Sequence, residues 1–246
     1  MKNIINSNHP RANSLNIREN LVEGFRKGLV VPHGLISHGR GEAFDYLVGE
    51  VTTKMALDSE IAAASLLLIS EAPIISVNGN TAALCSSHLV KLSLITNSLL
   101  EVNLYHKSKK RSDAIAVQLT KDGANKVYGV MADKTISGIA SNRQFVDKNG
   151  IYKADTVLIA IEDGDRAEAL FKMGKNVIAI ELNPLSRTAQ NASITIVDNI
   201  VRAIPNLISL STDLKNKDKS QLRKIVDKFD NDKNINKSIK LIRRGF

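Results

Sequence analysis

Glycine, histidine and arginine come together in residues 34–46, GLISHGRGEAFDY, around the start of a predicted helix. Glycine lets the backbone approach a ligand closely, and the start of a helix offers unpaired N–H groups to an anion. The pattern therefore predicts a phosphate-binding segment in which His38 and Arg40 are the candidate catalytic side chains. A turn that the glycines merely shape, with Arg40 as an exposed charge, is an equally good interpretation of the same residues.

Two further arginines precede this segment. Arg11 stands just before a predicted helix in HPRANSLN, residues 9–16, and Arg18 falls in the second turn of that helix. Because arginine makes forked contacts with phosphate or carboxylate, two arginines beside a glycine-rich segment fit a polyanionic ligand. Surface ion pairs are the alternative, and the spacing does not choose between the two.

An acidic run, EDGDR in residues 162–166, follows a strongly apolar segment. Carboxylates grouped around a glycine can bind Mg²⁺ or an ammonium group, which makes Asp163 and Asp165 candidate substrate-binding residues. Asp165 could instead do no more than cap the helix that comes next.

A nucleotide site is suggested by ELNPLSRT, residues 181–188. An acid at a strand end, Glu181, suits a ribose diol, while Arg187 and Thr188 suit phosphate oxygens. The pair Asp198 and Asn199 could bond an adenine edge, or either residue could simply be a helix N-cap. Together these residues indicate a nucleotide and a second, anionic substrate.

These residues need elements that bring them together, and short apolar runs alternate with helical segments along the chain. Strands are predicted over residues 74–77, 99–104, 126–130, 156–161, 176–180 and 194–197. Helices are predicted over residues 14–28, 42–70, 81–94, 108–122, 165–173 and 199–210. Because crossovers between parallel strands need helices, this alternation predicts a Rossmann-like, doubly wound α/β fold with a mostly parallel sheet and helices on both faces.

Ligands of such sheets bind beyond the carboxyl ends of the strands. Residues 78–80, 162–166, 181–183 and 198–199 all follow predicted strands and are polar. We therefore expect them to gather at one edge of the sheet, which adds Asn78 and Asn80 to the candidate substrate-binding residues.

Several other site types are not supported. The sequence contains neither GxxxxGK[ST] nor a GxGxxG after a strand, which excludes the commonest ATPase and dinucleotide-binding motifs. His33 and His38 lack further Cys or His at metal-ligand spacing, so no metal site is predicted. The single Cys85 lies in an apolar stretch and is predicted to be a core thiol in a reducing cytoplasm.

The net charge of +9 over 246 residues is concentrated at the C-terminus. Residues 213–246 hold eleven Lys or Arg against five Asp, so we predict a basic, helical tail there and one α/β domain with an N-terminal helical segment over residues 1–212. Only 4% of the residues are aromatic and none is Trp, which argues against nucleic-acid binding.

The longest uncharged stretch, residues 72–90, is interrupted by proline, glycine and polar residues, so it does not read as a membrane span. The start, MKNIINSNHP, lacks the apolar core of a secretory signal. We expect a soluble cytoplasmic protein with no membrane partner.

Seven blocks, in order, resemble the archaeal phosphopantothenate synthetases, also called 4-phosphopantoate–β-alanine ligases. The blocks are HPRANSLNIRENL (9–21), GLISHGRGEAFDYLVGE (34–50), ISVNGNTAAL (75–84), EVNL (101–104), IEDGDRAEAL (161–170), ELNPLSRTA (181–189) and IVDN (196–199). They extend over about 190 residues, and SVNGN and NPLSRTA are specific enough to make chance a poor explanation.

The resemblance implies a homodimer with a Rossmann-like core that acts in coenzyme A biosynthesis. Its reaction joins (R)-4-phosphopantoate to β-alanine through an acyl-adenylate, uses ATP with Mg²⁺, and yields 4′-phosphopantothenate, AMP and diphosphate. A non-catalytic ATP-binding regulatory protein of the same fold is the alternative.

The resemblance also implies roles for individual residues. ATP contacts are expected from Arg18, Arg40, Glu181, Leu182, Asn183, Arg187, Thr188, Asp198 and Asn199. Contacts with phosphopantoate or β-alanine are expected from Arg11, Asn78, Asn80, Asp163 and Asp165. The chain departs from the family's pattern at Glu181, where aspartate is expected, and in YHKSKKRSDAI, residues 105–115.

Overall fold

The structure is a computed structural model and describes residue 6 and residues 8–244. The first residues, which are predicted to lack a secretory signal, lie partly outside this range. Within it, no helix is long and apolar enough to cross a membrane. Nor do three His, Cys, Asp or Glu side chains of the described residues gather in a way that could hold a metal ion.

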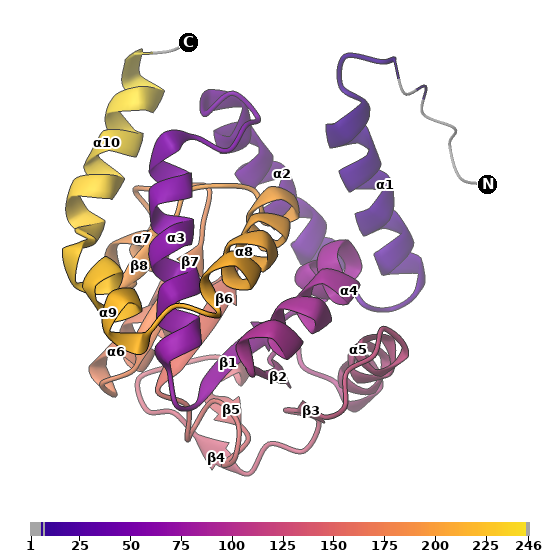
Figure 1. The fold of residues 1–246 in the computed structure, drawn as a ribbon. Coiled ribbons are helices and arrows are strands. Elements are labelled where there is room, and N and C mark those ends of the chain that lie inside the picture. The colour runs from indigo at the N-terminus through magenta and orange to yellow at the C-terminus, as the bar shows by residue number, and fades with distance from the viewer. Residues whose placement is uncertain (1–5, 7, 245–246) are drawn as a thin grey trace.

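A six-stranded parallel sheet forms the centre of the molecule (Figure 1). Its strands are β1 (Pro73–Val77), β2 (Leu99–Val102), β3 (Val127–Tyr128), β6 (Thr156–Ala160), β7 (Asn176–Ile180) and β8 (Ile194–Ile196). They lie in the order β3-β2-β1-β6-β7-β8, so each half grows outward from the central pair β1 and β6. This is the strand order of a Rossmann fold, and it confirms the predicted doubly wound α/β class.

Each face of the sheet is buried under its own set of elements. Ile75 and Leu158 belong to a core shared with one set of helices, whereas the adjacent Ile74 and Val157 belong to the opposite core, because successive side chains of a strand point to opposite faces. The helices of the first core are α3 (Lys54–Ile69), α4 (Gly79–Thr96), α5 (Lys109–Lys121) and α8 (Ile200–Leu214). The second core is covered by α6 (Gly164–Lys172), which packs beside the short α7 (Arg187–Asn191). Burial on both faces explains why the strands read as continuous apolar runs.

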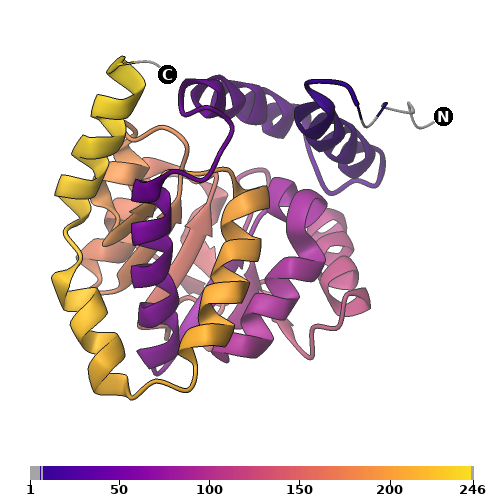
Figure 2. The same ribbon diagram turned by 45° about the horizontal axis from the view of Figure 1, so that its top comes forward.

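Two N-terminal helices, α1 (Ala12–Arg26) and α2 (Pro32–Leu47), lie at the top of the molecule in Figures 1 and 2. The single helix predicted over residues 42–70 is wrong, because Gly49 and Glu50, with φ of 85° and 55°, turn the chain between α2 and α3. Residues 34–46 lie within α2 and do not form a loop ahead of it. Pro32 begins the helix, a position that suits its fixed φ, and each glycine inside it lowers helix propensity by only about 1 kcal/mol.

Between β3 and β6 the chain forms a hairpin segment, residues 131–151, for which no elements are predicted. It contains β4 (Lys134–Thr135), the 3-10 helix η1 (Asn142–Gln144) and β5 (Phe145–Val146), and β4 and β5 form a small antiparallel sheet. The buried Glu101 of β2 holds this segment: its carboxylate accepts hydrogen bonds from the N–H groups of Asp147 at 3.0 Å and Ile151 at 2.6 Å. A Cβ on Gly150 would lie 1.9 Å from that carboxylate, so the close approach requires glycine.

The C-terminal residues form α9 (Lys219–Lys228) and α10 (Asn231–Arg244), which pack against α3 and beside β8. Leu222 and Ile235 are buried in these contacts. The side chain of Asn231 accepts a hydrogen bond from the backbone N–H of Thr195 in β8 at 2.7 Å. The expected boundary between residues 212 and 213 falls inside α8.

Candidate functional site

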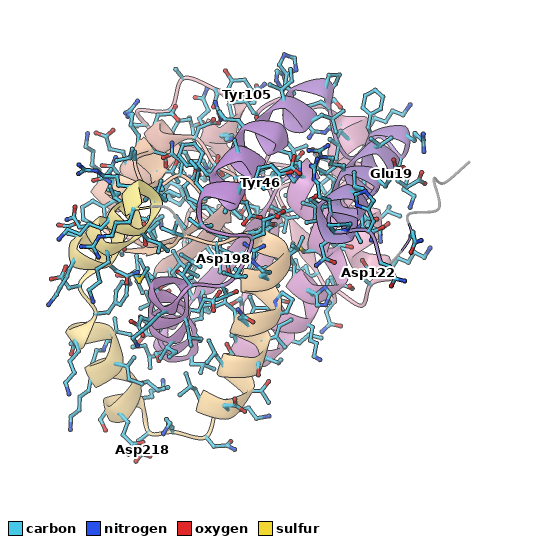
Figure 3. All side chains as sticks on the ribbon, turned by 90° about the horizontal axis from the view of Figure 1, so that it is seen from above. Glu19, Tyr46, Tyr105, Asp122, Asp198 and Asp218 are labelled. Atoms are coloured by element: carbon cyan, nitrogen blue, oxygen red, sulfur yellow. The ribbon has the colours of Figure 1, made fainter. Side chains whose placement is uncertain are left out.

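A cavity of about 780 Å³ lies between α2 and the carboxyl ends of the strands. Its floor is the point where β1 and β6 end side by side, and the Nδ2 of Asn78, just after β1, donates to the carbonyl of Ala160 in β6 at 2.8 Å. Seen from above, α2 crosses this region from the side of Tyr105 to the side of Asp198 (Figure 3). Ligands of open α/β sheets bind where the strand order reverses, so this cavity is the candidate active site.

Residues after β7 line one end of the cavity: Glu181, Leu182, Asn183, Arg187 and Thr188. The Glu181 carboxylate accepts a hydrogen bond from the N–H of Asn183 at 2.9 Å, and burial raises the pKa of Glu181 while the charge of Arg40 opposes that shift. Thr188 donates to the carbonyl of Glu162 at 2.8 Å. The Arg187 guanidinium lies 2.8 Å from Glu168, so a phosphate at this end would compete with that ion pair.

The helix α2 contributes His38 and Arg40 to the cavity wall. His38 is half-buried, its Nε2 has no hydrogen-bond partner among the described residues, and burial lowers the pKa of this imidazole. It is therefore neutral at pH 7 and able to accept a proton. Arg40 is exposed to the cavity and makes no ion pair with any described residue.

Asn78 and Asn80 line the cavity while their side chains hold the surrounding helices. Asn78 caps α4, with its Oδ1 accepting from the N–H of Thr81 at 3.0 Å. The Nδ2 of Asn80 donates to the carbonyl of Gly34 in α2 at 2.8 Å. A Cβ on Gly34 would lie 2.3 Å from the Oδ1 of Asn80, so this glycine allows α2 and α4 to approach each other.

Asp198 and Asn199 lie at the cavity below the C-terminal part of α2, each fully engaged with protein groups. Asp198 accepts hydrogen bonds from Thr52 at 2.6 Å and from the Nε of Arg202 at 2.8 Å. Asn199 is the N-cap of α8, and its Nδ2 donates to Asp45 of α2 at 2.8 Å. An adenine contact from Asn199 would require its amide to exchange one of these partners.

Three predicted site residues do not line the cavity. Arg18 pairs with Glu42 at 2.8 Å, and Arg11 donates to the hydroxyl of Tyr46. Both contacts join α1 to α2, which holds these arginines on the side of α2 that the cavity does not use. Asp165 lies in the first turn of α6, where its carboxylate accepts from the backbone N–H that follows it.

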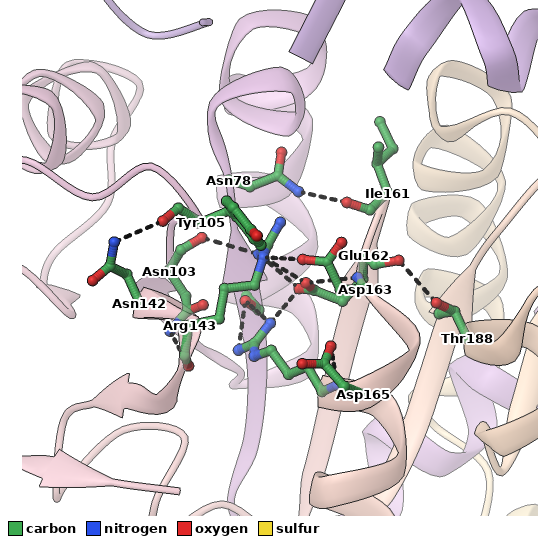
Figure 4. A network of polar contacts seen from close by, with 12 residues as sticks. Asn78, Asn103, Tyr105, Asn142, Arg143, Ile161, Glu162, Asp163, Asp165 and Thr188 are labelled. Carbon is green, nitrogen blue, oxygen red and sulfur yellow. Dashed lines mark hydrogen bonds and ion pairs between the residues drawn. The ribbon is translucent and has the colours of Figure 1, made fainter. Parts of the chain in front are cut away.

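A chain of ion pairs below the cavity centres on Glu162 (Figure 4). The Nε of Arg143, from the hairpin segment, lies 2.8 Å from the Glu162 carboxylate and 3.0 Å from that of Asp163. The wholly buried Arg166 of α6 contacts Glu162 from the other side. Burial raises the pKa of Asp163, whereas the charge of Arg143 lowers it. The two buried arginines thus share Glu162, Asp163 adds a second carboxylate beside Arg143, and Arg143 is held at the cavity wall.

The end of the cavity near β2 carries further nitrogen-bearing side chains. His33 of α2 and His106 after β2 have ring centroids 4.3 Å apart. Arg111 of α5 donates to the carbonyls of Leu29 and His106, both at 2.8 Å. All three side chains line the cavity, as does Tyr105.

Comparison with known proteins decides the family. Residues 55–245 match the family model described as phosphopantothenate/pantothenate synthetase. The chain belongs to this family. It is 48% identical over 233 residues to a 4-phosphopantoate–β-alanine ligase of Thermococcus onnurineus, covering 94% of this chain and 89% of that protein. It is 45% identical over 231 residues to the protein of that name from Methanosarcina mazei, covering 94% and 91% of the two chains.

In this phosphopantothenate/pantothenate synthetase family member, the match to the family model begins in α3 and includes the whole sheet, α9 and α10. Of the predicted site residues, twelve line the cavity: His38, Arg40, Asn78, Asn80, Asp163, Glu181, Leu182, Asn183, Arg187, Thr188, Asp198 and Asn199.

Sequence reasoning missed Arg111 and Arg143 as cavity residues. Arg111 lies in the first turn of α5, a short loop after β2. Its place beyond the end of a strand could therefore have predicted that it lines the cavity. The sequence around Arg143 does not predict its place, because the hairpin segment has no periodic pattern. Contacts with Glu101 and Glu162, which are distant along the chain, bring this segment to the cavity.

Proposed function

We propose that the chain joins (R)-4-phosphopantoate to β-alanine, consuming ATP and releasing AMP and diphosphate, and so makes 4′-phosphopantothenate for coenzyme A biosynthesis. The observation that carries this proposal is the cavity of about 780 Å³ at the centre of the sheet. Glu181 lies at one end with Arg40, which makes no ion pair among the described residues, and two further arginines lie at the other end. The names of the relatives support the same reaction.

The chemistry requires activation, because a free carboxylate is a poor electrophile. In the first step a carboxylate oxygen of phosphopantoate attacks the α-phosphorus of ATP, the bond from that phosphorus to the bridging oxygen breaks, and diphosphate leaves. In the second step the neutral amine of β-alanine attacks the acyl carbon, the bond to the AMP oxygen breaks, and a proton is lost from nitrogen. Positioned cations offset the repulsion between the two anions in the first step.

We assign Arg40 to the first step and His38 to the second. The guanidinium of Arg40, which no described carboxylate pairs with, can stabilise charge on the phosphates during adenylyl transfer. A neutral imidazole with a free nitrogen, as in His38, can take the proton that the β-alanine amine loses. Both side chains come from one helix, so they would act on one substrate complex.

For ATP we propose Glu181 as the ribose contact, with Leu182 and Asn183 beside it and Arg187 and Thr188 at the phosphates. The Asp163 carboxylate is 46% exposed at the cavity and could hold Mg²⁺ that arrives with the nucleotide. When bound, such an ion would neutralise phosphate charge.

We also propose a homodimer. Ile36 and Leu47 of α2 and the neighbouring Val51 are 72%, 48% and 52% exposed, which leaves an apolar surface on the top of the molecule. Light scattering coupled to size-exclusion chromatography gives the mass in solution. Ile36→Glu is expected to shift a dimer toward monomer.

The reaction itself is tested by mixing the purified protein with ATP, Mg²⁺, phosphopantoate and β-alanine, and following AMP and 4′-phosphopantothenate. Both products are expected in equal amounts. ATP binding without AMP formation would overturn the ligase proposal and favour a regulatory nucleotide-binding protein. The rate of AMP formation with pantoate in place of phosphopantoate shows which of the two acids is the substrate.

A further inference from the structure

The two ends of the cavity differ in which cations they present. Arg40 and Arg187 lie toward the β7 end. Arg111 and Arg143 lie toward the β2 end, which Arg111 reaches from α5 and Arg143 from the hairpin segment. The proposed ATP contacts occupy the first end and leave the second pair without a role.

Arg111 carries a positive charge that no described carboxylate neutralises. Its Nε and Nη1 donate to backbone carbonyls, and its Nη2 has no acceptor among the described residues. That Nη2 lies so close to Gly79, the first residue of α4, that a Cβ there would be 2.4 Å from it. The Nη2 of Arg111, without an acceptor among the described residues, therefore stands at the start of α4, where it can donate to an anion.

Arg143 is placed more rigidly. It is 6% exposed, with Nε against Glu162 and Nη1 donating to the carbonyl of Asn103 at 3.3 Å. One of its terminal nitrogens carries no contact in Figure 4 and is directed toward the side of Asn78. Arg166 pairs with the same Glu162, and Asp163 lies 3.0 Å from the Nε of Arg143, so two carboxylates hold the two buried arginines in place.

The surroundings show that these cations affect one another. The pKa of His106 is lowered by burial and by the charges of His33, Arg111 and Arg143, and that of Arg111 is lowered by burial and by Arg143. Among the nearby charges of the described residues, only that of Asp163 raises the pKa of His106. Arg143 is paired with Glu162 and Asp163, whereas Arg111 contacts only backbone carbonyls among the described residues. The charge of Arg111 is therefore left at this end of the cavity, where an anion would neutralise it.

We propose that Arg111 and Arg143 together bind the phosphoryl group of the acid substrate and determine its selectivity over the unphosphorylated acid. The assignment rests on the proposed function, because the acid's carboxylate must reach the α-phosphorus of ATP near Arg40. The phosphoryl group is at the opposite end of phosphopantoate and therefore falls at the β2 end. Glu162 and Arg166 are positioning residues, which fix Arg143 through their shared ion pairs.

The test is calorimetric binding of 4-phosphopantoate and of pantoate, without nucleotide, to the wild type, Arg111→Met and Arg143→Met. Each variant is expected to bind phosphopantoate at least 30-fold more weakly and pantoate within 3-fold of the wild type, so the selectivity collapses. The affinity of Arg143→Lys for phosphopantoate is expected to lie between those of the wild type and Arg143→Met, since lysine keeps the charge and loses the forked geometry. Affinity for a non-hydrolysable ATP analogue is expected to stay within 3-fold.

Two controls complete the design. Arg26→Met, on the exposed side of α1, is expected to change neither affinity, whereas Arg187→Met is expected to weaken the nucleotide and leave phosphopantoate binding intact. Melting curves show whether each variant is folded. If Arg143→Met does not fold, the test relies on Arg111→Met, because Arg111 is only half-buried.

Unchanged phosphopantoate affinity in both variants, or equal losses for both acids, would overturn the assignment while AMP formation by the wild type still supported the ligase. A wild type that binds neither acid and forms no AMP would overturn both proposals.

Discussion

At the scale of single residues, Arg40 is the side chain on which the proposed chemistry depends most. Arg40→Ala is expected to lower the rate of AMP formation by about 10² to 10³, or about 2 to 4 kcal/mol, because it removes a contact used mainly in the transition state. Arg40→Lys is not expected to restore the rate, since the forked geometry is lost. Steady-state assays with saturating substrates measure the effect.

Arg26→Ala, which removes an exposed guanidinium far from the cavity, is the matched control for Arg40 and is expected to be neutral. Activity of Arg40→Ala within threefold of the wild type would remove Arg40 from the mechanism.

Asn199 separates a structural role from an adenine contact. Its Oδ1 caps α8 and its Nδ2 bonds Asp45, so Asn199→Ala is expected to lower stability by about 1 to 2 kcal/mol and to leave the preference for ATP over GTP unchanged. Thermal melts and KM values for both nucleotides test this on one purified variant. A raised KM for ATP with an unchanged melting temperature would instead establish the adenine contact.

The cavity residues that could be predicted from sequence are those that directly follow a strand or begin a helix, such as Glu181 and Asn78. Local pattern fixes where a strand ends, and parallel strands end at one edge. Arg143 could not be predicted in this way, because its place depends on ion pairs with residues distant along the chain.

At the scale of elements, the contact between α3 and α8 contains a buried acid. Glu60 of α3 is wholly buried against Asn206 of α8, and burial, with the nearby charge of Asp198, raises the pKa of Glu60 to about 8. The folded state therefore keeps a proton that the unfolded state loses near pH 4.5, so stability falls as pH rises from about 4.5 to about 8.

Glu60→Gln is expected to leave stability nearly unchanged near pH 4.5 and to raise it at pH 9 by roughly 3 to 5 kcal/mol, because a neutral amide replaces an acid that must otherwise ionise inside the protein. Denaturant unfolding across this pH range measures the difference from the wild type. Glu71→Gln, at an exposed position, is the control. A difference that does not depend on pH would contradict the assignment.

Helix α2 shows where element prediction from sequence fails. The glycines that suggested a loop are tolerated inside a helix, and Gly34 is required there only because Asn80 of α4 packs against it. That requirement is a tertiary contact, which the local pattern does not contain. The strands, by contrast, were predictable because both of their faces are buried.

At the scale of the whole molecule, α9 and α10 act as part of the fold. Asn231 satisfies the backbone N–H of Thr195 in the edge strand β8, and Asn234 donates to the carbonyl of Met55 at 3.0 Å. Removing residues 230–246 is expected to expose β8, lower the melting temperature and promote aggregation. Melting curves and light scattering test this, and a truncated protein as stable as the wild type would show that α10 is dispensable.

The pairing of β1 with β6 has a consequence for folding. Each half of the sheet is built from strands that follow one another along the chain, whereas Pro73 pairs with Thr156 across the intervening half. Contacts between residues so far apart in the chain have a larger loop-closure cost than contacts within one half of the sheet. The cavity exists only after the two halves have paired through β1 and β6. A ligand that touches both halves binds only the joined state and holds it together, by about 2.7 kcal/mol at a concentration of 100 Kd. Bound substrate is thus expected to protect the joined halves against unfolding, in addition to its part in the reaction.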